Sequence, residues 1–191
     1  SHGDDEIFSR EQFLQWFNLD HLGRSAAQFD DAKLRWVNAQ HLKVMDDDAL
    51  AALVAPQLKK RGIAAADLAD GRLPRICALF KDRCTTTVEL ADWTGMYYVD
   101  VQPGEQELAT HVTDAVKPAL IALRGRLADV AWDKASIAAA IKATLAEHDL
   151  KMPQLAHAVR VLVCGRSQTP SLDAVLELFT REQVLWRLKS V

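Results

Sequence analysis

The chain has 191 residues, of which 49% are apolar, so it is long enough for one large or two small domains with a proper core. Alanine and leucine dominate and only 8 residues are glycine, a composition that favours helix over sheet. The net charge is −3, which by itself disfavours a nucleic-acid partner. A membrane span needs about 18 consecutive apolar residues, and no apolar run approaches that length, so we expect no membrane partner.

Three helix starts are indicated in residues 1–60. Ser9 and Gln12 have the spacing of a capping box, in which each side chain accepts a hydrogen bond from the other residue's free backbone N–H. Asp30 can cap a second helix. The run Asp46-Asp47-Asp48 places negative charge where the dipole of a third helix favours it.

Glycine, proline and threonine divide the next segment. Gly62 interrupts the helical pattern, and Pro74 is well placed in the first turn of a further helix. Thr85-Thr86-Thr87 can cap the following helix, which is expected to run past Gly95. The stretch 100–104 predicts a turn or linker, and we expect a domain boundary there.

Helix signals continue to the C-terminus. One helix is expected over residues 115–129. Further helices are predicted to begin near Asp133, Pro153, Thr169-Pro170 and Thr180. Gly165 is expected to end the helix that begins near Pro153. No segment alternates cleanly with period two, so the sequence predicts an all-α fold.

None of the common catalytic or metal-binding patterns is present. The sequence contains no P-loop, dinucleotide-binding glycine pattern, HExxH or nucleophile elbow, so no residue is assigned a catalytic role. The six histidines lack metal-ligand spacing, and Cys77, Cys84 and Cys164 are scattered without a CxxC pair. We therefore expect neither a metal nor a disulfide, and interpret the cysteines as buried side chains in a reducing compartment.

One arginine in the C-terminal third lies in an unusual context. Arg160 interrupts an apolar run, so it must reach solvent, pair with an acid or face a polar ligand. Beyond Gly165 a polar loop leads to the helix start expected at Thr169, whose free N–H groups favour an anion or a base. Basic residues outnumber acidic ones only in this region, by 8 to 6 over residues 131–191. A nucleic-acid site and an internal salt bridge beside an ordinary helix cap both fit this pattern.

The segment 155–172, which contains these residues, resembles the anticodon-binding segment of bacterial glutamyl-tRNA synthetases. Residues 29–38 are similar to the F-D-x-x-K-L-x-W-x-N helix of the same family. Residues 79–90, through Arg83, Thr86 and Glu89, and the pair Trp132-Asp133 are similar to two more of its segments. The segments occur in the family's order, so that the resemblance spans nearly the whole chain.

The resemblance implies two small helical subdomains of the helix-cage type. Residues 1–44 would be the helical end of the domain that contacts the tRNA stem. Residues 45–101 would form the first anticodon-binding subdomain, and residues 102–191 the second.

The resemblance also implies anticodon contacts. Arg160 would offer paired donors to a base, Thr169 a hydroxyl and a backbone N–H, and Leu172 a surface against the face of a base. By analogy, a further contact in the first subdomain falls near Lys81, with Arg83 close by.

Two departures from the family pattern matter. Cys164 precedes Gly165 where the family has a threonine or serine, so that position has no hydroxyl. Both class I synthetase signatures are absent, and the chain begins Ser-His-Gly without a methionine. We therefore expect a fragment of a glutamate–tRNA ligase whose catalytic domain lies upstream of Ser1. The parent enzyme would use ATP and Mg²⁺ there, and this fragment would hold no cofactor.

The implied partners are the tRNA for glutamate and the upstream catalytic domain of the same chain, in a cytoplasmic protein that we expect to be a monomer. The alternative hypothesis is an α-helical protein-interaction module that binds no nucleic acid, which the net negative charge favours.

Overall fold

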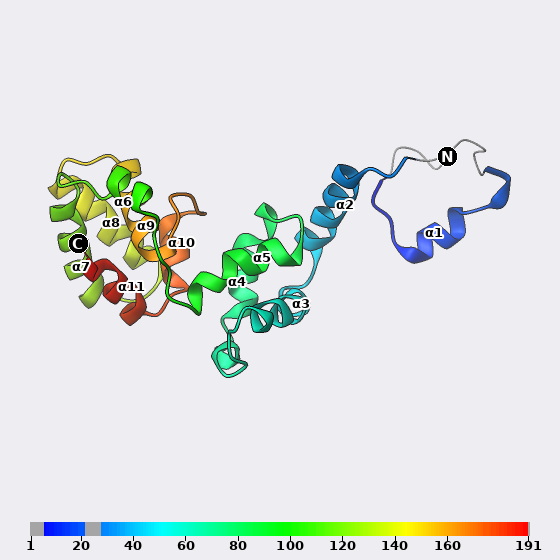
Figure 1. Ribbon diagram of the computed structural model, residues 1–191, viewed down its shortest axis with the longest axis horizontal. Helices are drawn as coiled ribbons and strands as arrows, with labels where there is room; N and C mark the ends of the chain where they lie inside the picture. The colour runs from blue at the N-terminus through cyan, green and yellow to red at the C-terminus, as the bar shows by residue number, and fades with distance from the viewer. Residues whose placement is uncertain (1–5, 22–27, 191) are drawn as a thin grey trace.

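The computed structural model describes residues 6–21 and 28–190. Within these ranges the chain forms eleven α-helices and no strand, so the all-α prediction is confirmed. The helices follow one another in an elongated molecule, with α1 (Arg10–Trp16) at one end and α6 to α11 (residues 105–187) at the other (Figure 1). No helix in the described ranges is both long enough and apolar enough to cross a membrane. Of the predicted stem-contact segment 1–44, residues 1–5 and 22–27 lie outside this description.

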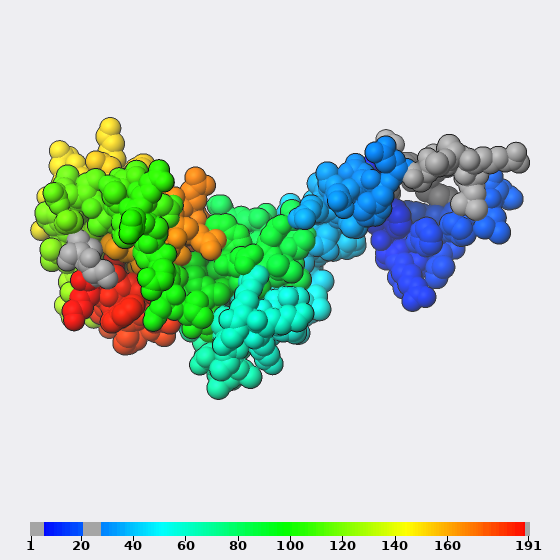
Figure 2. Space-filling view, in the orientation of Figure 1, coloured from blue at the N-terminus to red at the C-terminus, as the bar shows by residue number. Residues whose placement is uncertain are grey.

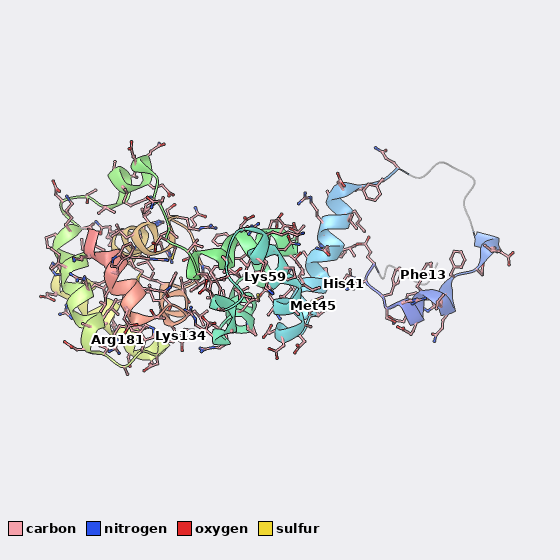
Figure 3. All side chains as sticks on the ribbon, turned by 60° about the horizontal axis from the view of Figure 1, so that its bottom comes forward. Phe13, His41, Met45, Lys59, Lys134 and Arg181 are labelled. Atoms are coloured by element: carbon pink, nitrogen blue, oxygen red, sulfur yellow. The ribbon has the colours of Figure 1, made fainter. Side chains whose placement is uncertain are left out.

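Helices α1 and α2 (Asp31–Val44) begin where their caps predict. In the capping box of α1, Ser9 Oγ accepts from the Gln12 backbone at 3.2 Å and Gln12 Oε1 accepts from the Ser9 backbone at 2.8 Å. Asp30 caps α2 by accepting from the Lys33 backbone at 3.0 Å. No residue of α1 is buried, and Phe13 lies far from the C-terminal helices (Figure 3), so the aromatic face of α1 is exposed.

Three helices form the first helix group (residues 47–97). They are α3 (Asp47–Lys60), α4 (Leu73–Phe80) and α5 (Thr87–Thr94). Each packs against the other two. The 3-10 helix Lys81–Arg83 follows α4 and contacts α2, and Asn38 of α2 donates a hydrogen bond to the Thr85 carbonyl. The helix expected to run past Gly95 instead ends at Thr94 and continues as the 3-10 helix Gly95–Tyr97.

The second helix group (residues 105–190) contains the remaining helices. They are α6 (Glu105–His111), α7 (Lys117–Asp129), α8 (Lys134–Glu147), α9 (Met152–Cys164), α10 (Leu172–Glu177) and α11 (Arg181–Arg187). Helix α8 packs between α7 and α10, α6 packs on α9, and α11 contacts both α7 and α9.

Two helix starts in this group differ from the sequence prediction. Helix α6 was not expected, because its N-cap is Gly104, which has no side chain to form the capping hydrogen bond that marks a start. Helix α10 begins at Leu172, with Ser171 as its N-cap, so the start predicted at Thr169-Pro170 was wrong. The Thr169 side chain and the Pro170 carbonyl are instead bound by Arg160, as described below.

One hydrophobic core extends through both helix groups. At its centre the rings of Tyr97 and Phe179 stack with centroids 4.1 Å apart, and Tyr97 Oη donates to the Val175 carbonyl at 3.2 Å. The predicted division into residues 1–44, 45–101 and 102–191 stays a prediction, because the core is continuous across residue 101. The three cysteines are free and buried, as interpreted, and burial raises the pKa of each thiol to about 12.

The contribution of the α8 cap to stability is expected to depend on pH. Asp133 accepts from the Ser136 backbone at 2.9 Å, and this bond holds the pKa of the Asp133 carboxyl below its ordinary value. A lowered folded-state pKa contributes stability above the unfolded-state pKa, and that contribution is lost as the pH falls through the folded-state value. We expect the stability advantage of the natural chain over Asp133→Asn to shrink below about pH 4, measured by urea unfolding at a series of pH values. An advantage that is constant down to about pH 2 would contradict the assignment.

Candidate nucleic-acid interface

Arg160 lies on α9 between two fully buried neighbours, Val159 and Val161, yet is itself partly exposed. Its Nε donates to Thr169 Oγ1 at 2.9 Å, and one Nη donates to the Pro170 carbonyl at 3.3 Å. In the part of the chain that the structure describes, Arg160 makes no ion pair with a carboxylate. The internal salt bridge that the sequence left open is therefore not what holds this side chain.

Thr169 is only 7% exposed, and its hydroxyl is bound inside the protein. Oγ1 accepts from Arg160 Nε and donates to the Pro170 carbonyl at 3.0 Å. The backbone at Thr169 precedes α10 by three residues and so does not form its N-terminus. The Thr169 hydroxyl therefore restrains the plane of the Arg160 guanidinium, and the base contact that the resemblance implies for Thr169 stays a prediction.

Replacing Thr169 with valine removes this oxygen and keeps the shape of the side chain. We expect Thr169→Val to lower the free energy of unfolding by about 0.5–1.5 kcal/mol, the usual net contribution of one hydrogen bond. Chemical denaturation measures the loss, and Thr169→Ser, which keeps the oxygen, is the control. A valine variant as stable as the natural chain would show that the bond to Arg160 contributes nothing.

A cavity of about 390 Å³ lies beside the Arg160 side chain. Its volume is within the range of about 300–1,000 Å³ that is typical of small-molecule sites. Its lining combines apolar side chains with a guanidinium, a hydroxyl and a carboxylate: Ala138, Ile141, Met152, Arg160, Ser171, Leu172 and Asp173. Leu172 is 4% exposed, so it contributes to the wall of the cavity and is not a projecting side chain. Ser171 and Asp173 were missed from sequence, where their only signal is that they flank Leu172.

Two candidate residues of the first helix group lie in different surroundings. Arg83 is exposed on the 3-10 helix 81–83, close enough to Arg160 for its charge to act there. The pKa of the Arg160 guanidinium is lowered chiefly by burial, and the Arg83 charge lowers it further. Lys81, in contrast, donates from Nζ to the Met45 carbonyl at 3.0 Å and to Asp47 Oδ1 at 2.8 Å, which ties the 3-10 helix to the start of α3. The Arg83 charge therefore acts on Arg160, whereas the Lys81 amine is bound to Met45 and Asp47.

The loop between α9 and α10 rests against the first helix group. The Arg166 guanidinium lies 4.2 Å from the centre of the Trp93 ring, and one Nη donates to the Asp92 carbonyl at 3.3 Å. In Figure 2 the orange atoms of this segment lie on the face shown, next to the green atoms of the first group. Gly165, which follows α9, has a φ of +69° and lies so close to Val101 that a Cβ there would be 3.1 Å from Val101 Cβ. The loop that follows Arg160 therefore packs directly against α5 of the first helix group.

An all-α fold with a partly exposed guanidinium in the lining of a cavity of about 390 Å³ is an arrangement suited to an unpaired nucleotide. The model of the anticodon binding domain family matches residues 49–191, and the chain belongs to that family. The glutamate–tRNA ligase of Paracidovorax citrulli is 69% identical to it over 190 residues, which are 100% of this chain and 40% of that protein. The glutamate–tRNA ligase of Albidiferax ferrireducens gives the same identity and the same coverage. The chain thus spans about 40% of the length of these relatives.

Solved structures support the same fold. The crystal structure of a glutamate tRNA ligase from Elizabethkingia meningosepticum, in complex with its amino acid, superimposes with a TM-score of 0.87 at 18% sequence identity. The match covers 97% of this chain and 37% of that one. The helical cage is therefore kept at low sequence identity, and the resemblance noted from the sequence is confirmed at the level of family and fold.

Proposed function

We propose that this chain recognises the anticodon of the tRNA for glutamate, as the C-terminal part of a glutamate–tRNA ligase. The observation that carries the proposal is the Arg160 guanidinium, which Thr169 holds in the lining of the cavity and on which the Arg83 charge acts. Membership of the anticodon binding domain family supports it.

The proposed mechanism uses unpaired bases. An anticodon base that leaves its stack can enter the cavity and lie against apolar side chains, with Leu172 in the wall. Arg160 has a second Nη with two further N–H donors, which suit the acceptor atoms on the edge of a base. Because Thr169 fixes the guanidinium plane, the donors are aimed before the RNA arrives.

The other candidates have supporting roles. Arg83 attracts the phosphate chain or the base next to the cavity, and its exposure leaves it accessible to RNA. Lys81 acts indirectly, because its amine holds the turn between α2 and α3 and so the 3-10 helix that carries Arg83. In our proposal Lys81 is a positioning residue, not a contact.

The length of the relatives bears on where the ligation reaction takes place. We propose that the ligation step, with its ATP and Mg²⁺, takes place outside these 191 residues, in a catalytic domain of the same protein. The exposed aromatic face of α1 would then lie toward that domain. The whole protein would act as a monomer in the cytoplasm.

The experiment that tests the proposal compares three RNAs with the same chain: the tRNA for glutamate, the same tRNA with one altered anticodon base, and a tRNA of another identity. Binding is measured at about 50 and about 200 mM salt, because phosphate contacts weaken as salt rises. We expect the first RNA to bind more tightly than the second and the third at both salt concentrations. Absence of binding even at low salt would favour a helical protein-interaction module, and equal binding of all three RNAs would leave only unspecific phosphate contact.

A further inference from the structure

Arg187, at the end of α11, is a charged residue buried in the core. It is 4% exposed, and its guanidinium lies 4.9 Å from the centre of the Phe179 ring. One Nη donates to the Val163 carbonyl in the second helix group. The other Nη donates to the Met96 carbonyl of the first helix group at 3.0 Å and to the Val99 carbonyl, just beyond that group, at 2.8 Å.

These three carbonyls come from the ends of helices. Val163 lies in the last turn of α9, and Met96 lies in the 3-10 helix that prolongs α5, with Val99 just beyond it. Carbonyls at a helix C-terminus have no partner within the helix and carry the negative end of its dipole. One guanidinium therefore caps two helix ends, one in each helix group.

Packing alone does not explain an arginine at this position. Val184 and Leu188, on the same face of the chain, are buried and apolar. A buried charge costs free energy unless it is hydrogen-bonded, and an apolar side chain in its place leaves buried carbonyls without donors. The planar fork of arginine bonds acceptors in several directions at once, which the single amine of lysine does less well.

Two other side chains also form hydrogen bonds between the first and the second helix group. Gln183 Nε2 donates to the Tyr97 carbonyl at 3.1 Å, and Arg72 donates to the Leu178 carbonyl at 2.9 Å. Arg72 also bonds both groups, through Asp70 and Leu178, but its side chain is 23% exposed, whereas Arg187 is 4% exposed and all three of its acceptors are backbone carbonyls. The orientation of the two groups decides where Arg83 lies relative to Arg160, which are carried by different groups.

We propose that Arg187 is the positioning residue that sets the orientation of the second helix group relative to the first, and with it the spacing between Arg83 and Arg160. Its consequence for RNA rests on the proposed function, whereas the orientation itself does not.

Distances between spin labels on the two groups test the orientation directly. Labels are attached at Lys60→Cys on α3 and Lys142→Cys on α8, both exposed positions. The natural cysteines are buried and their thiol pKa values are about 12, so they react slowly with the label. We expect a narrow distance distribution in the otherwise natural chain and a broader one in both Arg187→Met and Arg187→Lys.

Arg181 provides the matched control (Figure 3). It also donates to two backbone carbonyls, those of Ala128 and Val130, and its guanidinium lies 5.5 Å from the centre of the Trp132 ring. All of these partners belong to the second group, so Arg181→Met is expected to leave the distance distribution narrow. An unchanged distribution in the Arg187 variants, or equal broadening in Arg181→Met, overturns the proposal. Should Arg187→Met fail to fold, the width of the distance distribution in Arg187→Lys alone decides whether the proposal holds.

Binding of tRNA gives the second readout. In Arg187→Lys the ratio of affinities for the matched and the altered anticodon is expected to fall by about 2- to 30-fold, the range seen when a residue couples two sites without touching the ligand. If the natural chain does not discriminate between anticodons, the proposed function fails while the label distances still test Arg187. If discrimination persists in a variant with a broadened distribution, the orientation is set by Arg187 but does not serve recognition, and that link is refuted.

Discussion

Arg160→Ala is expected to weaken binding of the matched tRNA by about 1–3 kcal/mol, the range of discrimination for a good paired contact to a base. The side chain is held by Thr169 and Pro170 beside the cavity, so its removal takes away donors that the protein has already aimed. Equilibrium binding at one fixed salt concentration measures the loss. The loss should be smaller for tRNA with an altered anticodon base, since that RNA does not make the contact fully.

Two control variants separate base recognition from charge. Arg160→Lys keeps the charge but loses the planar fork, and we expect it to lose most of the discrimination. Lys59→Ala removes an exposed cation from the last turn of α3 (Figure 3) and should weaken all tRNAs slightly and equally. An equal loss for every anticodon in Arg160→Ala would show that Arg160 binds only phosphate.

Phe179→Ala is expected to lower the free energy of unfolding by about 3–5 kcal/mol, the usual cost of deleting a buried aromatic ring. Phe179 is 2% exposed, and the centre of its ring lies 4.1 Å from the centre of the Tyr97 ring and 4.9 Å from Cζ of Arg187. Its loss creates a cavity at the point where the two helix groups share their core. Urea denaturation monitored by circular dichroism measures the effect.

Trp186 is the matched control for this stability change. It belongs to α11 and is 61% exposed, so Trp186→Ala should change the free energy of unfolding by no more than about 0.5 kcal/mol. A similar loss in both variants would mean that the aromatic stack is not central to the core.

Helix starts could be predicted from the sequence where the signal is local. Ser9, Asp30, Asp46 and Thr180 each cap a helix within three residues of their own position, so a short window of sequence contains the whole interaction. Gly104 shows the limit of this approach, because α6 begins without any capping side chain.

The candidate site was predictable only in part. Arg160 could be singled out from the sequence because it is a charged residue in an apolar run. Its hydrogen-bond partners lie nine and ten residues away. Two acceptors of Arg187, on Met96 in the first helix group and on Val99 just beyond it, lie 91 and 88 residues away and are backbone carbonyls, which every residue possesses. Its position beside buried Val184 and Leu188 was the one local hint. That Lys81 bonds Met45 and Asp47 likewise depends on the packing of helices distant in sequence.

The bond between Thr169 and Arg160 has a thermodynamic consequence for association. Immobilising a side chain with many rotamers at an interface usually costs about 0.5–1.5 kcal/mol of conformational entropy on binding. Here the guanidinium is already immobilised in the free protein, so that cost is met during folding. The free chain is therefore preorganised, and a nucleotide entering the cavity gains the full enthalpy of the guanidinium contact without first restricting the arginine.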